Sequence, residues 1–177
     1  GARIHTYAKF GTAVVIFPDG FKIDVASARM EYYSFPAALP IVEMSSIKLD
    51  LFRRDFTVNT LAIQLNSKKF GILIDFFAAQ KDIKEKTIRV LHNLSFVEDP
   101  TRVFRAIRFE QRFGFRIGKL TSGLIENAVR MDFFKDLSGR RLFSELRQIL
   151  EEDKPIMALR RINEYDLLKL IHPELVF

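Results

Sequence analysis

The sequence contains no cysteine and no tryptophan in 177 residues, and only three histidines. The lack of cysteine excludes disulfide bonds, thiolate zinc sites and cysteine nucleophiles. It is compatible with a reducing, cytoplasmic setting, which we expect. His5, His92 and His172 are far apart and show no metal-ligand spacing. No run approaches the roughly 18 apolar residues of a membrane span, and residues 1–7 do not resemble a signal peptide, so we expect no membrane contact.

Positive charge, by contrast, is in excess. The net charge is +6, with 28% charged and 48% hydrophobic residues, which is the balance of a soluble globular protein. A basic chain favours a polyanionic partner such as nucleic acid or a nucleotide. Many basic proteins bind neither, so the charge can only support a function that is argued from other features.

The first quarter of the chain predicts β-structure. Residues 12–17 and 21–25 are apolar, β-branched runs on either side of Pro18-Asp19-Gly20, a pattern that indicates a hairpin. We expect this hairpin to have no partner strand. Residues 26–40 contain two prolines and mixed polarity, which predicts an irregular loop.

The character of the chain changes after Asp82. Before it, residues 47–63 have apolar residues at helical intervals and residues 70–77 are strand-like. After it, we predict one short strand near residues 87–91 and then helices to the end. The helix breaks are expected near Gly114, Gly118, Ser138-Gly139 and Lys154-Pro155. The sequence therefore predicts an α+β fold in two segments, with a boundary near residues 82–95.

The first candidate site is the segment from Arg53 to Asn59. Arg53 and Arg54 offer donors suited to phosphate oxygens, and Asp55 offers an acceptor suited to ribose hydroxyls. Asn59 follows Asp55 by four residues, so we expect both on one helical face. The spacing alone is more typical of a surface ion pair with a capping aspartate.

The second candidate site is the segment from Glu98 to Phe109. Helical spacing puts Arg102, Arg105 and Arg112 within about a quarter-turn, with Arg108 at its edge. Arginines are not buried without partners, so this face either binds an anion or is solvated. The opposite face predicts a core made by Val103, Phe104 and Ile107.

The start of this helix has two candidate positions. Asp99 before Pro100 fits an N-cap followed by the first helical residue. Ser95 with Glu98 fits a capping box one turn earlier. The sequence does not decide between them.

Together the two segments resemble the class II tRNA nucleotidyltransferase and bacterial poly(A) polymerase family. Residues 53–59 match the family motif Arg-Arg-Asp-Phe-Thr-x-Asn, and residues 98–109 match Glu-Asp-x-x-Arg-x-x-Arg-Ala-x-Arg-Phe completely. The hinge motif between them lacks both of its glycines, which are Ala78 and Ala79 here. Arg141 and Glu145 lie where the fifth motif has an arginine and a glutamate.

The resemblance implies a role for each matched residue. Asp99 and Arg102 would contact the Watson–Crick edge of CTP or ATP, since cytosine and adenine both present an amine beside an acceptor nitrogen. Arg54 and Arg105 would bind the triphosphate. The nucleotide-binding set would comprise Arg53, Arg54, Asp55, Asn59, Asp99, Arg102, Arg105 and Arg108, with Asp55 and Asn59 facing the ribose.

The resemblance also implies a domain order. Residues 1–85 would be the C-terminal part of a nucleotidyltransferase head with a partial β-sheet, residues 86–153 an all-α neck, and residues 154–177 the start of a helical body. The remainder of the same polypeptide would be a partner of this segment.

The family reaction transfers CMP or AMP to the 3′ end of tRNA and uses Mg²⁺ bound by an Asp-x-Asp pair. Neither that pair nor the Gly-Gly-x-Val-Arg-Asp loop before it occurs here. Asp24 alone fits a further catalytic and metal-binding carboxylate, although an exposed strand-end acid is an equal alternative. We therefore expect a fragment that recognises nucleotides and is inactive alone.

Two questions stay open at this level. CCA-adding, CC-adding, A-adding and poly(A)-polymerising members share these motifs. A non-catalytic nucleotide- or RNA-binding module is the alternative function.

Overall fold

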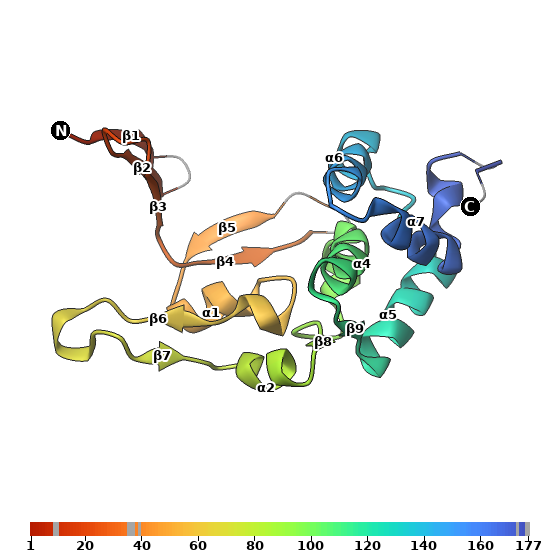
Figure 1. The fold of residues 1–177 in the computed structure, drawn as a ribbon, viewed down its shortest axis with the longest axis horizontal. Helices are drawn as coiled ribbons and strands as arrows, with labels where there is room; N and C mark the ends of the chain where they lie inside the picture. Colours follow the sequence, from red (N-terminus) through yellow and green to blue (C-terminus); the bar gives the residue numbers. More distant parts are fainter. Residues whose placement is uncertain (9–10, 35–37, 39, 173, 176–177) are drawn as a thin grey trace.

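The structure is a computed structural model that describes residues 1–8, 11–34, 38, 40–172 and 174–175. It has mixed α and β structure, with most strands in the first half and most helices in the second (Figure 1). None of the helices in these residues has the length and apolar character needed to cross a bilayer.

The predicted hairpin is confirmed and belongs to a larger sheet. Strands β2 (Thr12–Ile16) and β3 (Lys22–Ala26) pair antiparallel. Strand β1 (Arg3–Tyr7) pairs with the other edge of β2, so the expectation of a hairpin without a partner strand is wrong. All five residues of β1 are exposed, and an exposed strand lacks the apolar alternation by which a sequence indicates one. The three strands extend away from the helices (Figure 1).

A second strand pair lies where the sequence predicts only a loop. Strand β4 (Arg29–Tyr32) pairs antiparallel with β5 (Ile41–Met44). The loop prediction for residues 26–40 is therefore wrong for β4, while residues 35–37 and 39 lie outside the described residues. Pro40 precedes β5 and does not interrupt a strand, which explains why a proline-rich segment accommodates the pair.

The single helix predicted for residues 47–63 is replaced by several short elements. These are α1 (Ile47–Phe52), the 3₁₀ helix η2 (Thr57–Asn59) and strand β6 (Ala62–Ile63). Strand β6 pairs with β7 (Leu73–Ile74), and the 3₁₀ helix η3 (Ser67–Lys69) lies between them. Of residues 70–77, which are predicted to be a strand, only Leu73 and Ile74 form one. The helix stops because Phe56 is extended, fully buried and bridged to Val90. Tertiary packing overrides the helical period here.

The second half follows the predicted helix breaks closely. Its elements are α2 (Ala79–Lys84), β8 (Thr87–Ile88), α3 (Ser95–Glu98), α4 (Thr101–Phe113), β9 (Arg116–Ile117), α5 (Lys119–Arg130), α6 (Gly139–Leu150), α7 (Pro155–Glu164) and the 3₁₀ helix η4 (Leu167–Leu170). The prediction of an all-α segment is wrong in one respect, because β9 pairs in parallel with β8. Gly114 ends α4 with φ 61°, the left-handed conformation that glycine adopts readily.

One hydrophobic core surrounds α4. Val103, Phe104 and Ile107 are fully buried, as predicted, and they share this core with Phe56 and Ile88 from the first half of the chain. The helices therefore do not form a separate all-α unit in the described residues. The domain limits at residues 85 and 153 stay a prediction.

The alanines that replace the hinge glycines have different backbone conformations. Ala78 has φ 59°, whereas Ala79 is the first residue of α2 and is fully buried. A left-handed alanine costs roughly 1–2 kcal/mol. We expect Ala78→Gly to raise the free energy of unfolding by about 1 kcal/mol, and the matched control Ala79→Gly to lower it by about 1 kcal/mol. Urea unfolding followed by circular dichroism measures both, and a shift of both variants in one direction contradicts this account.

Candidate functional site

A cavity of about 500 Å³ opens between α4 and the segment that follows α1. The predicted residues that line it are Arg53, Arg54, Asp55, Asn59, Asp99, Arg102 and Arg105. The remaining lining residues are Glu31, Tyr33, Thr101 and Glu145. The structure thus brings the two sequence motifs together on one cavity, whose walls are almost entirely polar.

Asp55 and Arg105 join the two motifs directly. The Nε and Nη2 atoms of Arg105 donate to Oδ2 of Asp55 at 2.8 and 2.6 Å. Oδ1 of Asp55 accepts from Nδ2 of Asn59 at 2.9 Å, so these two residues are neighbours. They do not share the face of a regular helix, contrary to the prediction, because a turn and the 3₁₀ helix η2 bring them together. Burial disfavours the charged form of Arg105, but the carboxylates of Asp55, Glu145 and Asp99 together outweigh burial and raise the pKa of Arg105. These carboxylates therefore maintain a permanent cation on the cavity wall.

The two adjacent arginines differ in their partners. Arg53 forms ion pairs with Asp50 at 2.9 Å and with Glu31 at 3.0 Å. Arg54 donates from Nη1 to the carbonyl oxygen of Asn59 at 2.8 Å, and its side chain is 43% exposed. The charge of Arg53 is thus balanced by two close carboxylates, whereas Arg54 is the more accessible of the two.

Asp99 and Arg102 are both fixed by neighbouring groups. Oδ1 of Asp99 accepts from Nη2 of Arg141 at 2.8 Å and from Oγ1 of Thr101 at 2.6 Å. Arg102 donates to Oγ of Ser95 at 2.9 Å and to the carbonyl oxygen of Arg53 at 2.8 Å. A carboxylate and a guanidinium held in this way are preorganised to form hydrogen bonds to the edge of a planar ligand.

The structure supports the Asp99 alternative for the helix start and contradicts the capping box, because the N-cap of α3 is Leu94 and no side-chain capping hydrogen bond is formed there. Ser95 begins the short helix α3, and Asp99 is extended between α3 and α4. Oδ1 of Asp99 also accepts from the backbone nitrogen of Thr101 at 2.9 Å, so Asp99 contacts the first turn of α4.

Arg108 lies apart from the cavity. Its side chain is buried and lies 3.5 Å from Glu152 and 4.0 Å from Glu145, and Arg112 also pairs with Glu152, at 2.8 Å. The arginines of α4 therefore divide into a pair at the cavity and a pair that faces Glu152. Burial raises the pKa of Glu145, although Arg105 and Arg108 act against it.

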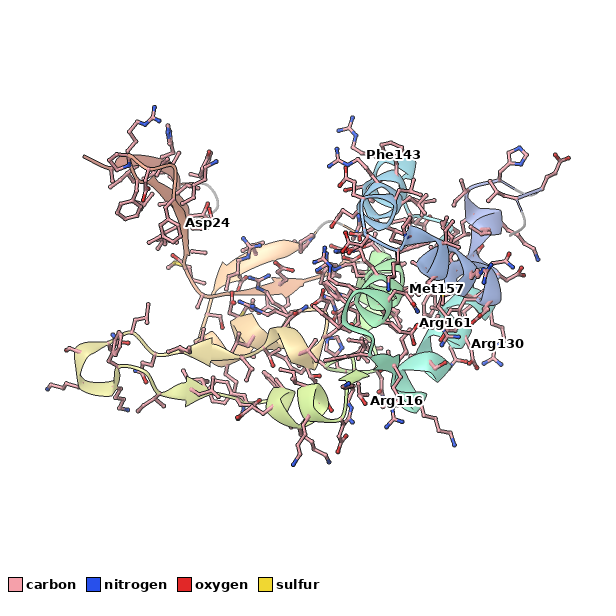
Figure 2. All side chains as sticks on the ribbon, viewed as in Figure 1. Asp24, Arg116, Arg130, Phe143, Met157 and Arg161 are labelled. Atoms are coloured by element: carbon pink, nitrogen blue, oxygen red, sulfur yellow. The ribbon has the colours of Figure 1, made fainter. Side chains whose placement is uncertain are left out.

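Asp24 is not brought to the cavity either. It is an exposed residue of β3, opposite Val14 of β2, and Figure 2 shows it on the sheet that extends away from the helices. No group of three or more histidine, aspartate or glutamate side chains with metal-site geometry occurs in the described residues. Asp24 is not part of any such group, and its metal role stays a prediction.

Sequence reasoning missed Glu31 and Tyr33 as site residues. They come from β4 and the residue after it, 22 and 20 positions before the first motif begins at Arg53, and no local pattern marks them. Glu145 and Arg141 belong to the fifth motif, which the sequence analysis noted without placing them at the cavity. Glu145 pairs with Arg105 and Arg141 donates to Asp99. Spacing could not predict these contacts, since each joins residues about 40 positions apart.

Comparison with known proteins decides the family. Residues 2–89 match the Poly A polymerase head domain, and residues 114–177 match the family described as the probable RNA and SrmB-binding site of polymerase A. This chain belongs to the tRNA nucleotidyltransferase and poly(A) polymerase family.

Individual similar proteins support this family assignment. The chain is 63% identical over 176 residues to the A-adding tRNA nucleotidyltransferase of Geobacter sulfurreducens, covering 99% of this chain and 20% of the relative. The solved apo form II of a CCA-adding enzyme superposes with a TM-score of 0.94 at 49% identity, over 98% of this chain and 41% of that one. A CCA-adding enzyme with ATP gives 0.88 at 46% identity, over 100% and 40%. The chain thus spans a fifth of the first curated relative's length and about two fifths of these solved chains.

Proposed function

We propose that this chain is the nucleotide-recognising part of an enzyme that transfers CMP or AMP from CTP or ATP to the 3′ end of tRNA. The observation that carries the proposal is the convergence of residues 53–59 and 98–105 on one polar cavity. A cavity of about 500 Å³ is within the usual range for small-molecule sites.

Each wall of the cavity suits one part of a nucleoside triphosphate. Asp99 accepts from the exocyclic amine of adenine or cytosine, and Arg102 donates to the adjacent ring acceptor. Arg105 and Arg54 contact the phosphates with charge-assisted hydrogen bonds. Asn59 and Asp55 contact the ribose hydroxyls, and Asp55 also accepts from Arg105 and Asn59. Arg53 and Arg108 position two carboxylates that line the cavity, because Arg53 pairs with Glu31 and Arg108 lies 4.0 Å from Glu145.

ATP is the nucleotide that we favour. The Geobacter sulfurreducens relative, 63% identical to this chain, is named A-adding. A CCA-adding enzyme of the same fold was solved with ATP. Both support AMP transfer to tRNA as the reaction of the longer protein.

The strands provide an apolar surface for that longer protein. Exposed apolar side chains occur on β3, β5 and the β6–β7 hairpin, among them Val25, Val42, Met44, Ile63 and Phe70. Exposed apolar side chains gain free energy when another surface covers them. We propose that further segments of the same polypeptide cover them.

Nucleotide selectivity tests the proposed function. Isothermal titration calorimetry of the 177-residue chain should give binding of ATP and CTP that is about tenfold tighter than that of GTP and UTP, since a mismatched pair of edge hydrogen bonds costs about 1–3 kcal/mol. Equal affinity for all four nucleotides, or no binding of any, contradicts the proposal.

We also expect the 177 residues alone to incorporate no AMP or CMP into tRNA. Phosphoryl transfer of this kind depends on positioned metal ions, and the described residues provide no cluster of carboxylates to bind them. Incubation with labelled ATP and tRNA lacking its 3′ adenosine measures this directly. Labelled tRNA above background contradicts the expectation.

A further inference from the structure

Among the described residues that line the cavity, Tyr33 has the one aromatic side chain. All the other lining residues are charged or polar. Tyr33 follows the last residue of β4 and is half-buried. Its neighbour Tyr32 is exposed, donates its hydroxyl to Sδ of Met30 and does not line the cavity. Two adjacent tyrosines thus occupy contrasting positions.

The Tyr33 ring is fixed at its hydroxyl end. The hydroxyl donates to Oε2 of Glu31 at 3.1 Å. Glu31 in turn pairs with Arg53 at 3.0 Å and with Arg29 at 3.2 Å. Burial, followed by the charge of Glu31, raises the pKa of Tyr33 to about 12, so the hydroxyl stays protonated and remains a donor at neutral pH. A ring anchored in this way loses little freedom when a ligand contacts it.

Tyr33 also lies near the residues assigned to the nucleotide base. The charges of Arg102 and Asp99 both act on its hydroxyl. Arg102 donates to the carbonyl oxygen of Arg53, whose guanidinium binds the same glutamate as Tyr33. Tyr33, Asp99 and Arg102 all line this one cavity.

Hydrogen bonds to the edge of a base leave its two faces uncovered. An aromatic side chain is the group that covers such a face most effectively, and stacking on one contributes about 1–3 kcal/mol per base. We propose that Tyr33 stacks on the base of the bound nucleoside triphosphate, next to Asp99 and Arg102. This inference rests on the proposed nucleotide-binding function. The stacking contact contributes to the affinity for the base and does not contribute to the affinity for the phosphates.

Calorimetry of the 177-residue chain with ATP and with inorganic tripolyphosphate separates the two contributions. For Tyr33→Leu we expect about a tenfold loss of ATP affinity, which corresponds to one lost stacking contact. Affinity for tripolyphosphate should remain unchanged, and this also shows that the variant is folded. Tyr33→Phe keeps the ring and should stay within about threefold of the unsubstituted chain, the cost of one hydrogen bond. The matched control Tyr32→Leu should bind ATP like the unsubstituted chain.

The fluorescence of a Tyr33→Trp variant tests the stacking contact without relying on Tyr33→Leu. The chain has no tryptophan, so in Tyr33→Trp all indole emission comes from this position. ATP should quench that emission by stacking, while tripolyphosphate should not.

The outcomes distinguish a failure of the stacking role from a failure of the proposed nucleotide-binding function. Unchanged ATP affinity in Tyr33→Leu, or equal losses for ATP and tripolyphosphate, overturns the stacking role and leaves the nucleotide site standing. Failure of the unsubstituted chain to bind ATP overturns the proposed function, and the stacking role with it.

Discussion

Replacing Arg105 with alanine should lower the affinity of the chain for ATP and CTP by about 10- to 100-fold, because hydrogen bonds to charged groups contribute about 1.5–3 kcal/mol each. Arg105 is 31% exposed at the cavity and is oriented by Asp55 through two hydrogen bonds. Its raised pKa keeps it charged. The loss should be the same for both nucleotides, since the triphosphate is common to them. Calorimetry at constant salt measures it.

Two variants control this prediction. Arg112→Ala removes an arginine from the same helix that pairs with Glu152 and does not line the cavity, so its affinity for ATP should match that of the unsubstituted chain. Arg105→Lys retains the charge beside Asp55 and preserves the fold, but it lacks the planar fork and should lose about tenfold. If Arg112→Ala is as damaging as Arg105→Ala, the effect reflects net charge and the phosphate assignment is contradicted.

Replacing Asp99 with alanine should abolish the preference for ATP and CTP over GTP and UTP, a change of about tenfold in the affinity ratio. Asp99 supplies the acceptor that the exocyclic amine of adenine and cytosine requires, whereas guanine and uracil present a carbonyl there. The phosphate contacts remain, so affinity for tripolyphosphate should not change. Competition between ATP and GTP for the chain measures the ratio.

The Arg105→Ala chain is the reciprocal control, since it should bind all four nucleotides more weakly and keep their ratio. An Asp99→Ala chain that still prefers ATP and CTP contradicts the base assignment. Arg141 and Thr101 hold Asp99 in place through hydrogen bonds. Variants of these two residues should therefore reduce the preference for ATP and CTP less than loss of the Asp99 carboxylate does.

The sequence predicted the parts of the fold that local pattern determines. The helix α4 and its core residues Val103, Phe104 and Ile107 follow from the apolar period of one continuous segment. The hairpin of β2 and β3 follows from its turn residues. The family resemblance supplied most of the residues that line the cavity, from Arg53 to Asn59 and from Asp99 to Arg105.

What could not be predicted depends on contacts between distant segments. Strand β4 forms because β5 pairs with it across a connection of eight residues (33–40), and strand preference is set largely by such partners. The bridge from Phe56 to Val90 ends a helical pattern that otherwise continues. Arg105 and Arg108 belong to the same motif and the same helix, yet only Arg105 lines the cavity. Arg108 lies beside Glu152 instead. Glu31 and Tyr33 reach the site through β4, so the sequence could not assign them.

A crystal structure of the 177-residue chain with ATP tests the central claim most directly. The account predicts adenine in the cavity, with its amine within hydrogen-bonding distance of Asp99, and the triphosphate beside Arg105. ATP bound elsewhere on the chain, or bound in the cavity with its phosphates at Asp99 and Arg102, would contradict it.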